Sequence, residues 1–327
     1  MNTILDVKDL VIHYETDDGC VYAVNGLDLD LREGETLGLV GETGAGKTTL
    51  ARGIMGLVPD PPGKIRGGEI VYRGTDLLRC SNAEMRKVRG RKIAMIFQDP
   101  MTSLNPVTTV GVQIAEAIQS HEKLSHKDAM RKACQMLEQV GIPAERAGEY
   151  PHQFSGGMKQ RVVISIALAC NPDILIADEP TTALDVTIQA QVLDMLRELR
   201  ESFNMSMLLI THDLGVVAQT CDRVAVIYGG EIVESADVYT LFDRHLHPYT
   251  QGLLDSIPKL NEDVDRLKPI EGMMPDPTQV PEGCRFCSRC TYAGERCRTE
   301  HPAMLDLGGG HKVRCFRYET QEVEPHA

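Results

Sequence analysis

A glycine-rich run near the start of the chain has the composition that binds phosphate groups. The run Gly41-Glu-Thr-Gly-Ala-Gly-Lys-Thr-Thr49 fits the pattern G-x-x-x-x-G-K-[ST]. Glycines allow backbone N–H groups to curl around phosphates, and the N-terminus of a following helix adds partial positive charge. We expect Lys47 to contact the β- and γ-phosphates and the Thr48 hydroxyl to bind Mg²⁺. The alternative, a glycine-rich turn that binds nothing, is disfavoured because an apolar strand precedes the run and a helical pattern follows it.

An acidic pair forms the second candidate for chemistry. Asp178 and Glu179 follow the apolar run Ile174-Leu-Ile-Ala177, which predicts a strand buried in a parallel sheet. Such sheets bind ligands at the carboxyl ends of their strands. We expect Asp178 to bind Mg²⁺ through water and Glu179 to act as general base towards an attacking water. Without other motifs, two acidic residues after a strand would indicate only a solvated turn. The glycine-rich loop earlier in the chain favours a role in Mg²⁺ binding and catalysis.

Five of the ten cysteines are concentrated near the C-terminus. They are Cys284, Cys287, Cys290, Cys297 and Cys315, whereas the other five sit singly and are expected to be small buried hydrophobes. A dense cysteine cluster in a reducing compartment indicates metal binding before disulfides, and thiolates suit both iron–sulfur clusters and Zn²⁺. The many arginines around these thiols would help to stabilise the negative charge of either site.

The elements that must position these groups follow from periodicity. Residues 5–12 and 21–31 alternate as strands around the turn Asp17-Asp-Gly19, and further strands are expected at 37–40, 69–72, 93–97, 174–177, 207–210 and 223–228. Helices are expected from residue 47 towards Pro59, through a helical insert at about 110–140, after Gly157, and at 188–203 and 214–220. Strands alternating with helices predict an α/β core with a parallel sheet. Beyond a boundary at about residue 235 to 245, prolines predict a loop-rich tail.

Composition restricts the class of protein. The 327 residues are 42% hydrophobic and 25% charged, as in a globular protein, and no apolar run approaches the roughly 20 residues that span a bilayer. The formal net charge of −13 disfavours non-specific affinity for nucleic acid or anionic lipid. The N-terminal residues lack a secretory signal, so we expect a cytoplasmic location, with docking on a membrane protein if the chain works at a membrane.

Further motifs between and after these two sites resemble those of ATP-binding-cassette (ABC) proteins. Phe154-Ser-Gly-Gly-Met-Lys-Gln-Arg161 resembles the family's signature motif. Gln98 resembles the Q-loop, Ala183-Leu-Asp185 the D-loop, and Thr211-His-Asp213 the H-loop, all in the family's order. The resemblance covers about residues 3–245. Taken singly, Gln98 or His212 would be an ordinary polar residue at a strand end.

The family resemblance implies a fold and a mechanism. The implied fold is that of a P-loop NTPase with a RecA-like parallel sheet core, an antiparallel β subdomain and an α-helical subdomain at about 100–160. In this chain the ATPase domain would comprise residues 1–240, and a C-terminal extension would follow at 241–327. Two cassettes are expected to sandwich two ATP molecules, and hydrolysis opens the dimer. The signature residues Ser155, Gly156, Gly157 and Met158 would contact the partner's ATP, with Asp185 in the D-loop.

The resemblance also assigns the remaining residues of the ATP site. Lys47, Glu179 and His212 are expected to act in catalysis, and Thr48, Gln98 and Asp178 to bind Mg²⁺. Tyr14 is the candidate for stacking on adenine, with Tyr22 second and core packing nearly as favoured for either. The residues expected to contact ATP are Tyr14, Gly41, Glu42, Thr43, Gly44, Ala45, Gly46, Lys47, Thr48, Thr49, Gln98 and His212.

Two stretches, Gln98-Asp-Pro-Met-Thr-Ser-Leu-Asn-Pro106 and His247-Pro-Tyr-Thr250, resemble the D-type ATPase subunit of oligopeptide and dipeptide permeases. That group implies a peripheral subunit on the cytoplasmic face of the cell membrane. Its partners would be an F-type ATPase, two membrane-spanning subunits and an extracytoplasmic solute-binding protein, with no nucleic acid. Importers of nickel, glutathione or sugar oligomers share much of this pattern. A soluble ABC ATPase acting on nucleic acid or ribosomes and a small-molecule P-loop kinase are more distant alternatives.

The cysteine tail also resembles this permease group, some members of which carry a [4Fe-4S] cluster. The implied ligands are Cys284, Cys290, Cys297 and Cys315. Cys287 departs from that pattern and makes a ferredoxin-like C-x2-C-x2-C run, so it is a possible substitute ligand. Zn²⁺ and free thiols or a disulfide are the alternatives. The role expected for the site is to hold together a tail with little core of its own.

Overall fold

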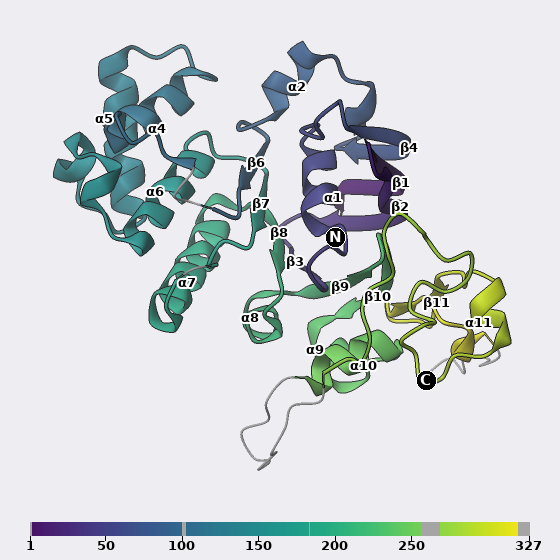
Figure 1. Cartoon of the computed structure of the whole chain (residues 1–327). Helices are drawn as coiled ribbons and strands as arrows, with labels where there is room; N and C mark the ends of the chain where they lie inside the picture. The colour runs from purple at the N-terminus through teal and green to yellow at the C-terminus, as the bar shows by residue number, and fades with distance from the viewer. Residues whose placement is uncertain (1, 100–102, 183, 257–268, 320–327) are drawn as a thin grey trace. The chain divides into compact units, whose positions relative to one another are not determined.

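A computed structural model describes residues 2–99, 103–182, 184–256 and 269–319 (Figure 1). The chain divides into two compact units. The first comprises residues 1–3, 31–36 and 77–210, and the second comprises residues 4–30, 37–76 and 211–327. Both units therefore combine segments that are far apart in the sequence.

The second unit contains an antiparallel sheet. Its strands β1 (Thr3–Thr16), β2 (Gly19–Arg32), β4 (Gly63–Tyr72) and β5 (Thr75–Asp76) lie in the order β2-β1-β4-β5. Leu5 and Val7 are buried with period two, as are Leu10 and Ile12, and a register shift between Lys8 and Val11 interrupts the predicted alternation. The predicted hairpin turn joins β1 to β2.

The second unit also contains part of the central sheet. The strand β3 (Thr36–Val40) pairs in parallel with β9 (Arg223–Tyr228), and all residues of both strands are buried. The strand β10 (Glu231–Asp237) runs antiparallel to β9. It also pairs with β12 (Lys312–Val313), which in turn pairs with β11 (Leu305–Asp306). The C-terminal extension is therefore anchored by backbone hydrogen bonds to β10.

The first unit holds three further parallel strands, β6 (Ile93–Ile96), β7 (Ile174–Asp178) and β8 (Ser206–Thr211). Its helices are α2 (Asn82–Val88), α4 (Val110–Gln119), α5 (His126–Gln139), α6 (Gly156–Leu168) and α7 (Val186–Phe203). Figure 1 shows α4, α5 and α6 gathered together, and their buried apolar faces meet, as the predicted helical insert requires. The predicted α/β class is confirmed.

The helices of the second unit are α1 (Lys47–Ile54), α8 (Leu214–Thr220), α9 (Val238–Asp243), α10 (Pro248–Asp255) and α11 (Glu295–Thr299). The helix predicted to run towards Pro59 ends at Ile54, before Gly56, which has φ 58°. The tail is less loop-rich at its start than predicted, because Asp237 and His247 cap α9 and α10. Pro248 stands in the first turn of α10, where a proline costs no helical hydrogen bond.

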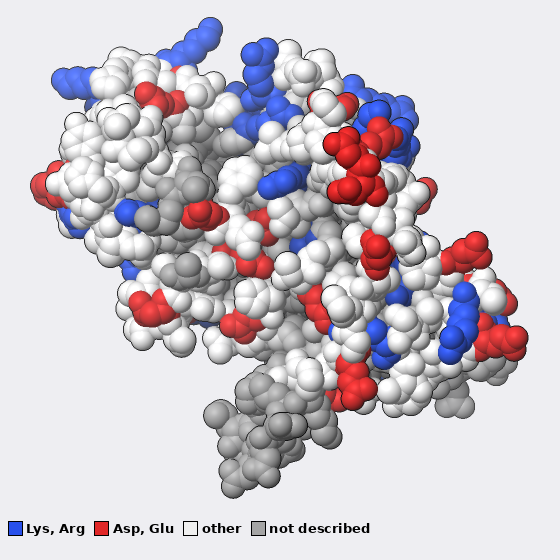
Figure 2. Space-filling view, in the orientation of Figure 1, with Lys and Arg blue, Asp and Glu red and all other residues white. Residues whose placement is uncertain are grey.

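Among the described residues, no helix is both long and apolar enough to cross a membrane. On the face shown in Figure 2, acidic and basic side chains are interspersed among uncharged ones. The helix α7 is the longest of those described, and its charged residues all lie in the stretch from Asp194 to Glu201.

Candidate functional site

The glycine-rich run forms the connection between β3 and α1 in the second unit. A Cβ atom on Gly41 would lie 2.2 Å from the carbonyl oxygen of Ile227, and one on Gly46 would lie 2.5 Å from that of Ala23. Gly46 also has φ 108°, a conformation that L side chains rarely adopt. These positions require glycine because the backbone of the loop packs directly on neighbouring backbone. No side chain caps the N-terminus of α1, and a helix N-terminus of this kind favours an anion.

Lys47 lies at the centre of this loop. Its side chain is buried, and its ammonium donates hydrogen bonds to the carbonyl oxygens of Gly41 at 2.6 Å and Glu42 at 2.9 Å. The cation is therefore held inside the curl of the loop. Thr43 and Gly44 are exposed, whereas Thr48 and Thr49 are half-buried at the start of α1. This arrangement offers one buried positive charge, a helix N-terminus and two threonine hydroxyls to a phosphate chain.

The two candidate tyrosines, one on each strand of the hairpin, make different contacts. The Tyr14 hydroxyl lies 3.5 Å from the Thr49 hydroxyl, so the ring is adjacent to the first turn of α1. Tyr22 instead packs edge-on against His13, with ring centroids 4.6 Å apart. Its backbone N–H donates to Pro277 of the extension at 2.9 Å. Tyr22 also lines a pocket together with Thr43 and Gly44 of the glycine-rich loop, so both tyrosines lie beside the candidate phosphate site.

His212, also in the second unit, follows β8 directly and is exposed. The next residue, Asp213, caps α8 by accepting hydrogen bonds from the backbone N–H groups of Gly215 and Val216 at 2.8 and 3.2 Å. His212 therefore lies at a strand-to-helix connection whose backbone is held by a local cap.

The acidic pair lies at the end of β7 in the first unit. Asp178 is 2% exposed, and Glu179 adopts φ 47°. A positive φ is uncommon outside glycine and often marks a functional site. One oxygen of the Glu179 carboxylate accepts hydrogen bonds from the Gln98 amide at 3.0 Å and the Thr182 hydroxyl at 2.9 Å. The predicted general base and the predicted Q-loop residue are thus in direct contact.

The signature residues lie at the start of α6, also in the first unit. Ser155 caps the helix by accepting from the Met158 N–H at 3.4 Å, and Ser155 and Gly156 are exposed. A Cβ on Gly157 would lie 2.5 Å from the Ile188 side chain of α7, so this position admits only glycine without a shift. The exposed cap presents a hydroxyl and helical N–H groups to a ligand outside the unit.

Asp185 caps α7 by accepting from the Ile188 N–H at 3.0 Å. Its D-loop neighbour Ala183 and residues 100–102 of the Q-loop stretch lie outside the described residues. Met158, the last of the predicted signature contacts, lies 3.3 Å from the Arg146 guanidinium through its sulfur.

The five C-terminal cysteines line one small cavity of about 20 Å³ together with His247 and Phe286. All five are free thiols, and burial raises the pKa of Cys284 to about 12 and raises those of Cys290 and Cys315. The donor chemistry of the five thiols fits a thiolate-bound metal. However, no three His, Cys, Asp or Glu side chains within the described part of the chain are spaced to hold a metal ion. The predicted metal centre is therefore not supported as a preformed site.

Three functional candidates were missed by sequence reasoning. Thr182 contacts Glu179, and Tyr249 and Arg289 both contact Glu42 of the glycine-rich loop. Tyr249 belongs to the His-Pro-Tyr-Thr stretch and Arg289 lies within the cysteine run, so both residues lie in motifs that the sequence already marks. No local pattern connects either residue to a loop more than 200 positions earlier.

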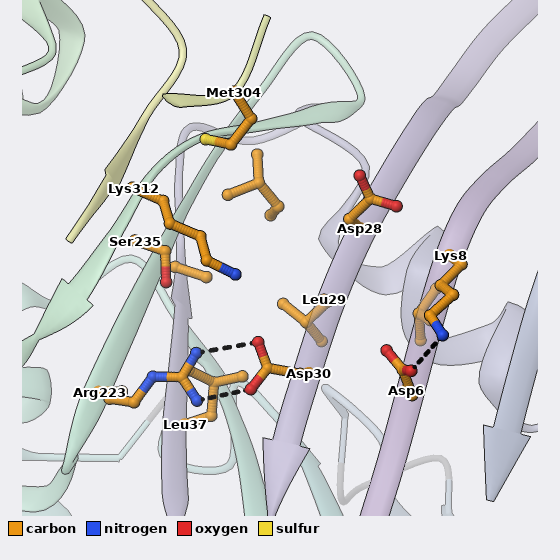
Figure 3. A pocket seen from close by; sticks show the side chains of 13 residues that line it. Asp6, Lys8, Asp28, Leu29, Asp30, Leu37, Arg223, Ser235, Met304 and Lys312 are labelled. Atoms are coloured by element: carbon orange, nitrogen blue, oxygen red, sulfur yellow. Dashed lines mark hydrogen bonds and ion pairs between the residues drawn. The ribbon is translucent and has the colours of Figure 1, made fainter. Parts of the chain in front are cut away.

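A separate open pocket of about 410 Å³ lies within the second unit (Figure 3). At its floor Arg223 forms a bidentate ion pair with Asp30, with distances of 2.9 and 3.2 Å. Lys312 of the extension points into the pocket from the same side as Ser235 (Figure 3). None of the predicted site residues lines this pocket.

Comparison with known proteins identifies two matching family models. The model described as ABC transporter matches residues 24–182, and the model described as oligopeptide/dipeptide transporter, C-terminal region, matches residues 233–297. The first match contains the glycine-rich loop, the signature run and the acidic pair. The second contains four of the five clustered cysteines.

Relatives of known name match over nearly the whole chain. The oligopeptide transport ATP-binding protein AppD of Bacillus subtilis is 49% identical over 326 residues, which are 99% of both chains. The dipeptide transport ATP-binding protein DppD of the same organism is 49% identical over 97% of this chain and 95% of its own. Among solved structures, the dimeric post-hydrolysis state of the ATP-binding cassette MJ0796 bound to ADP and Pi has a TM-score of 0.64 at 28% identity. That match covers 72% of this chain and 98% of the other.

Proposed function

This chain belongs to the ATP-binding proteins of ABC transporters of the oligopeptide/dipeptide type, and on that premise we propose that it powers the import of peptides. As a member of the family it is an ATPase coupled to transport. The observation that carries the proposal is the glycine-rich loop with Lys47 buried inside it, followed by the family's C-terminal region. The named relatives transport oligopeptides or dipeptides, which is why peptide is the proposed substrate.

The roles of individual residues follow from their chemistry. The buried ammonium of Lys47 would bind the β- and γ-phosphates, supported by the N–H groups of the loop. Tyr14 would stack on adenine. Oxygen donors suit Mg²⁺, so the Thr48 hydroxyl, the Gln98 amide and the Asp178 carboxylate would hold the ion that neutralises phosphate charge.

Glu179 would accept a proton from the attacking water. Its hydrogen bonds with Gln98 and Thr182 hold the carboxylate in place at the end of β7. His212 would contact the γ-phosphate and help to align the water. The N-terminus of α6, formed by Ser155, Gly156, Gly157 and Met158, would bind the ATP of a second cassette. Asp185 of the D-loop would lie near the interface between the two cassettes.

We propose a heterodimer with an F-type ATPase subunit, docked on two membrane-spanning subunits that receive solute from a binding protein. The chain would therefore act at the cytoplasmic face of the membrane. We also retain the division into an ATPase domain at 1–240 and an extension at 241–327. The match of the extension to the transporter C-terminal region supports that division.

A metal in the tail is a further part of the proposal. The chemistry that five converging thiols would supply is the binding of a [4Fe-4S] cluster or, alternatively, Zn²⁺. We assign the metal a structural role and no step in hydrolysis.

The function is tested with a Lys47→Ala variant. Cells lacking the gene are complemented with the wild-type chain or the variant, and uptake of labelled dipeptides, oligopeptides and nickel is measured. We expect peptide uptake to be restored only by the wild-type chain, and purified Lys47→Ala to lose ATP binding. Restoration of nickel uptake alone would refute the peptide assignment, and ATP binding by the variant at wild-type affinity would refute the phosphate site.

A further inference from the structure

Glu42, the second residue of the glycine-rich loop, is held at three points. Its backbone N–H donates to the Tyr249 hydroxyl at 2.9 Å, and its carbonyl oxygen accepts from Lys47 at 2.9 Å. Its carboxylate receives both terminal nitrogens of Arg289, at 2.7 and 3.0 Å. Two of the three partners therefore come from the C-terminal part of the chain. A loop residue fixed through its donor, its acceptor and its side chain has little freedom to rotate.

Arg289 is itself rigidly placed. Only 5% of its side chain is exposed. It donates to the carbonyl oxygens of Glu271 at 3.0 Å and Ile270 at 3.2 Å, in addition to Glu42. The Glu42 side chain is 29% exposed, so the bidentate pair is geometrically specific and partly shielded from screening by salt. An arginine guanidinium is protonated at any physiological pH, so Arg289 brings a full positive charge to Glu42.

Tyr249 is equally well fixed. Its side chain is fully buried against Tyr228 and Phe286, with ring centroids 4.5 and 5.4 Å away. Burial raises the pKa of its hydroxyl, which remains protonated. The hydroxyl oxygen therefore serves as a fixed acceptor for the loop N–H. The aromatic group of Tyr228, Tyr249 and Phe286 packs beneath the same loop residue that Arg289 binds.

The charge of Glu42 explains why such a support matters. A carboxylate within the loop would repel a bound triphosphate unless its charge is balanced. Arg289 supplies that balance from outside the loop, and Tyr249 fixes the direction of the adjacent peptide. We propose that Arg289 and Tyr249 are positioning residues that keep the glycine-rich loop in the conformation and charge state that bind ATP. This inference rests on the proposed function, and it gives the C-terminal extension a direct part in nucleotide affinity.

The test is the affinity of the purified full-length chain for ATP, measured with a fluorescent ATP analogue in Mg²⁺, alongside KM and kcat for hydrolysis. Arg289→Gln is expected to raise Kd and KM about tenfold with kcat within about twofold of the wild type. The double variant Glu42→Gln/Arg289→Gln removes the uncompensated charge as well. It is expected to return Kd to within about threefold of the wild type, because the two changes act on one interaction.

Arg296→Gln is the matched control. Arg296 lies in the same extension, pairs with Glu300 and Glu319 on the surface, and contacts no loop residue among its described partners. It is expected to leave Kd unchanged. If the Arg289→Gln chain does not fold, Tyr249→Phe, which removes only the hydroxyl, is expected to raise Kd about threefold.

The outcomes separate the two proposals. A wild-type chain that does not bind ATP refutes the proposed function itself. A wild-type chain that binds ATP while Arg289→Gln and Tyr249→Phe bind it equally well refutes the positioning role alone. An Arg289→Gln defect that Glu42→Gln does not relieve would show that Arg289 only stabilises the fold, which also overturns the inference.

Discussion

The change Glu179→Gln tests the proposed chemistry most directly. The substitution keeps the size and shape of the side chain. The single carboxylate oxygen that accepts from Gln98 and Thr182 can be replaced by the amide oxygen, so both hydrogen bonds persist. What disappears is the basicity of the group. General base catalysis contributes about 10²–10⁴-fold to rate, or roughly 3 to 5 kcal/mol in the barrier.

We therefore expect kcat for ATP hydrolysis to fall by about 10²–10⁴-fold while KM stays within about threefold. ATP should then accumulate in an undissociated dimer with the partner cassette, which size-exclusion chromatography in ATP would detect. Phosphate release gives the rate. The control is Glu201→Gln on α7, whose side chain is 65% exposed; it should match the wild type.

Two results would contradict this reasoning. A kcat within tenfold of the wild type would mean that another group accepts the proton. A chromatogram with only monomer in the presence of ATP and the partner would mean that nucleotide does not join two cassettes. In either case the assignment of Glu179, or of the dimer mechanism, would have to be abandoned.

Two further predictions concern the extension. Burial lowers the pKa of His247 to about 4, below its value of about 6.5 in the unfolded chain, so the unfolded state binds more protons as pH falls through this window. The free energy of unfolding should therefore fall by about 2 kcal/mol between pH 8 and pH 5 through this group. The variant His247→Asn keeps a capping side chain and should make the free energy of unfolding, measured with urea, depend less on pH. The second prediction concerns the cysteines: protein purified without oxygen should be brown, with absorbance near about 400 nm, if they hold an iron–sulfur cluster. Colourless protein with about one zinc per chain would instead indicate Zn²⁺. Protein without metal would contradict both assignments.

The sequence by itself determined the elements and the local motifs. The phosphate loop, the buried strand before Asp178 and the helix after Gly157 are each written in a few consecutive residues, because strand period, helix period and capping act over one or two turns. Their predicted positions agree with the structure to within a few residues. The order of the motifs was enough to identify the family.

Only the tertiary structure decided which distant residues meet. The pairing of Glu42 with Arg289 spans 247 positions, and no periodicity encodes it. The positive φ of Glu179 and the gathering of five cysteines around one cavity likewise depend on how the completed elements pack. The physical reason is that side-chain contacts between remote segments are set by the packing of whole elements in a shared core, whereas secondary structure and caps are set by neighbours along the chain.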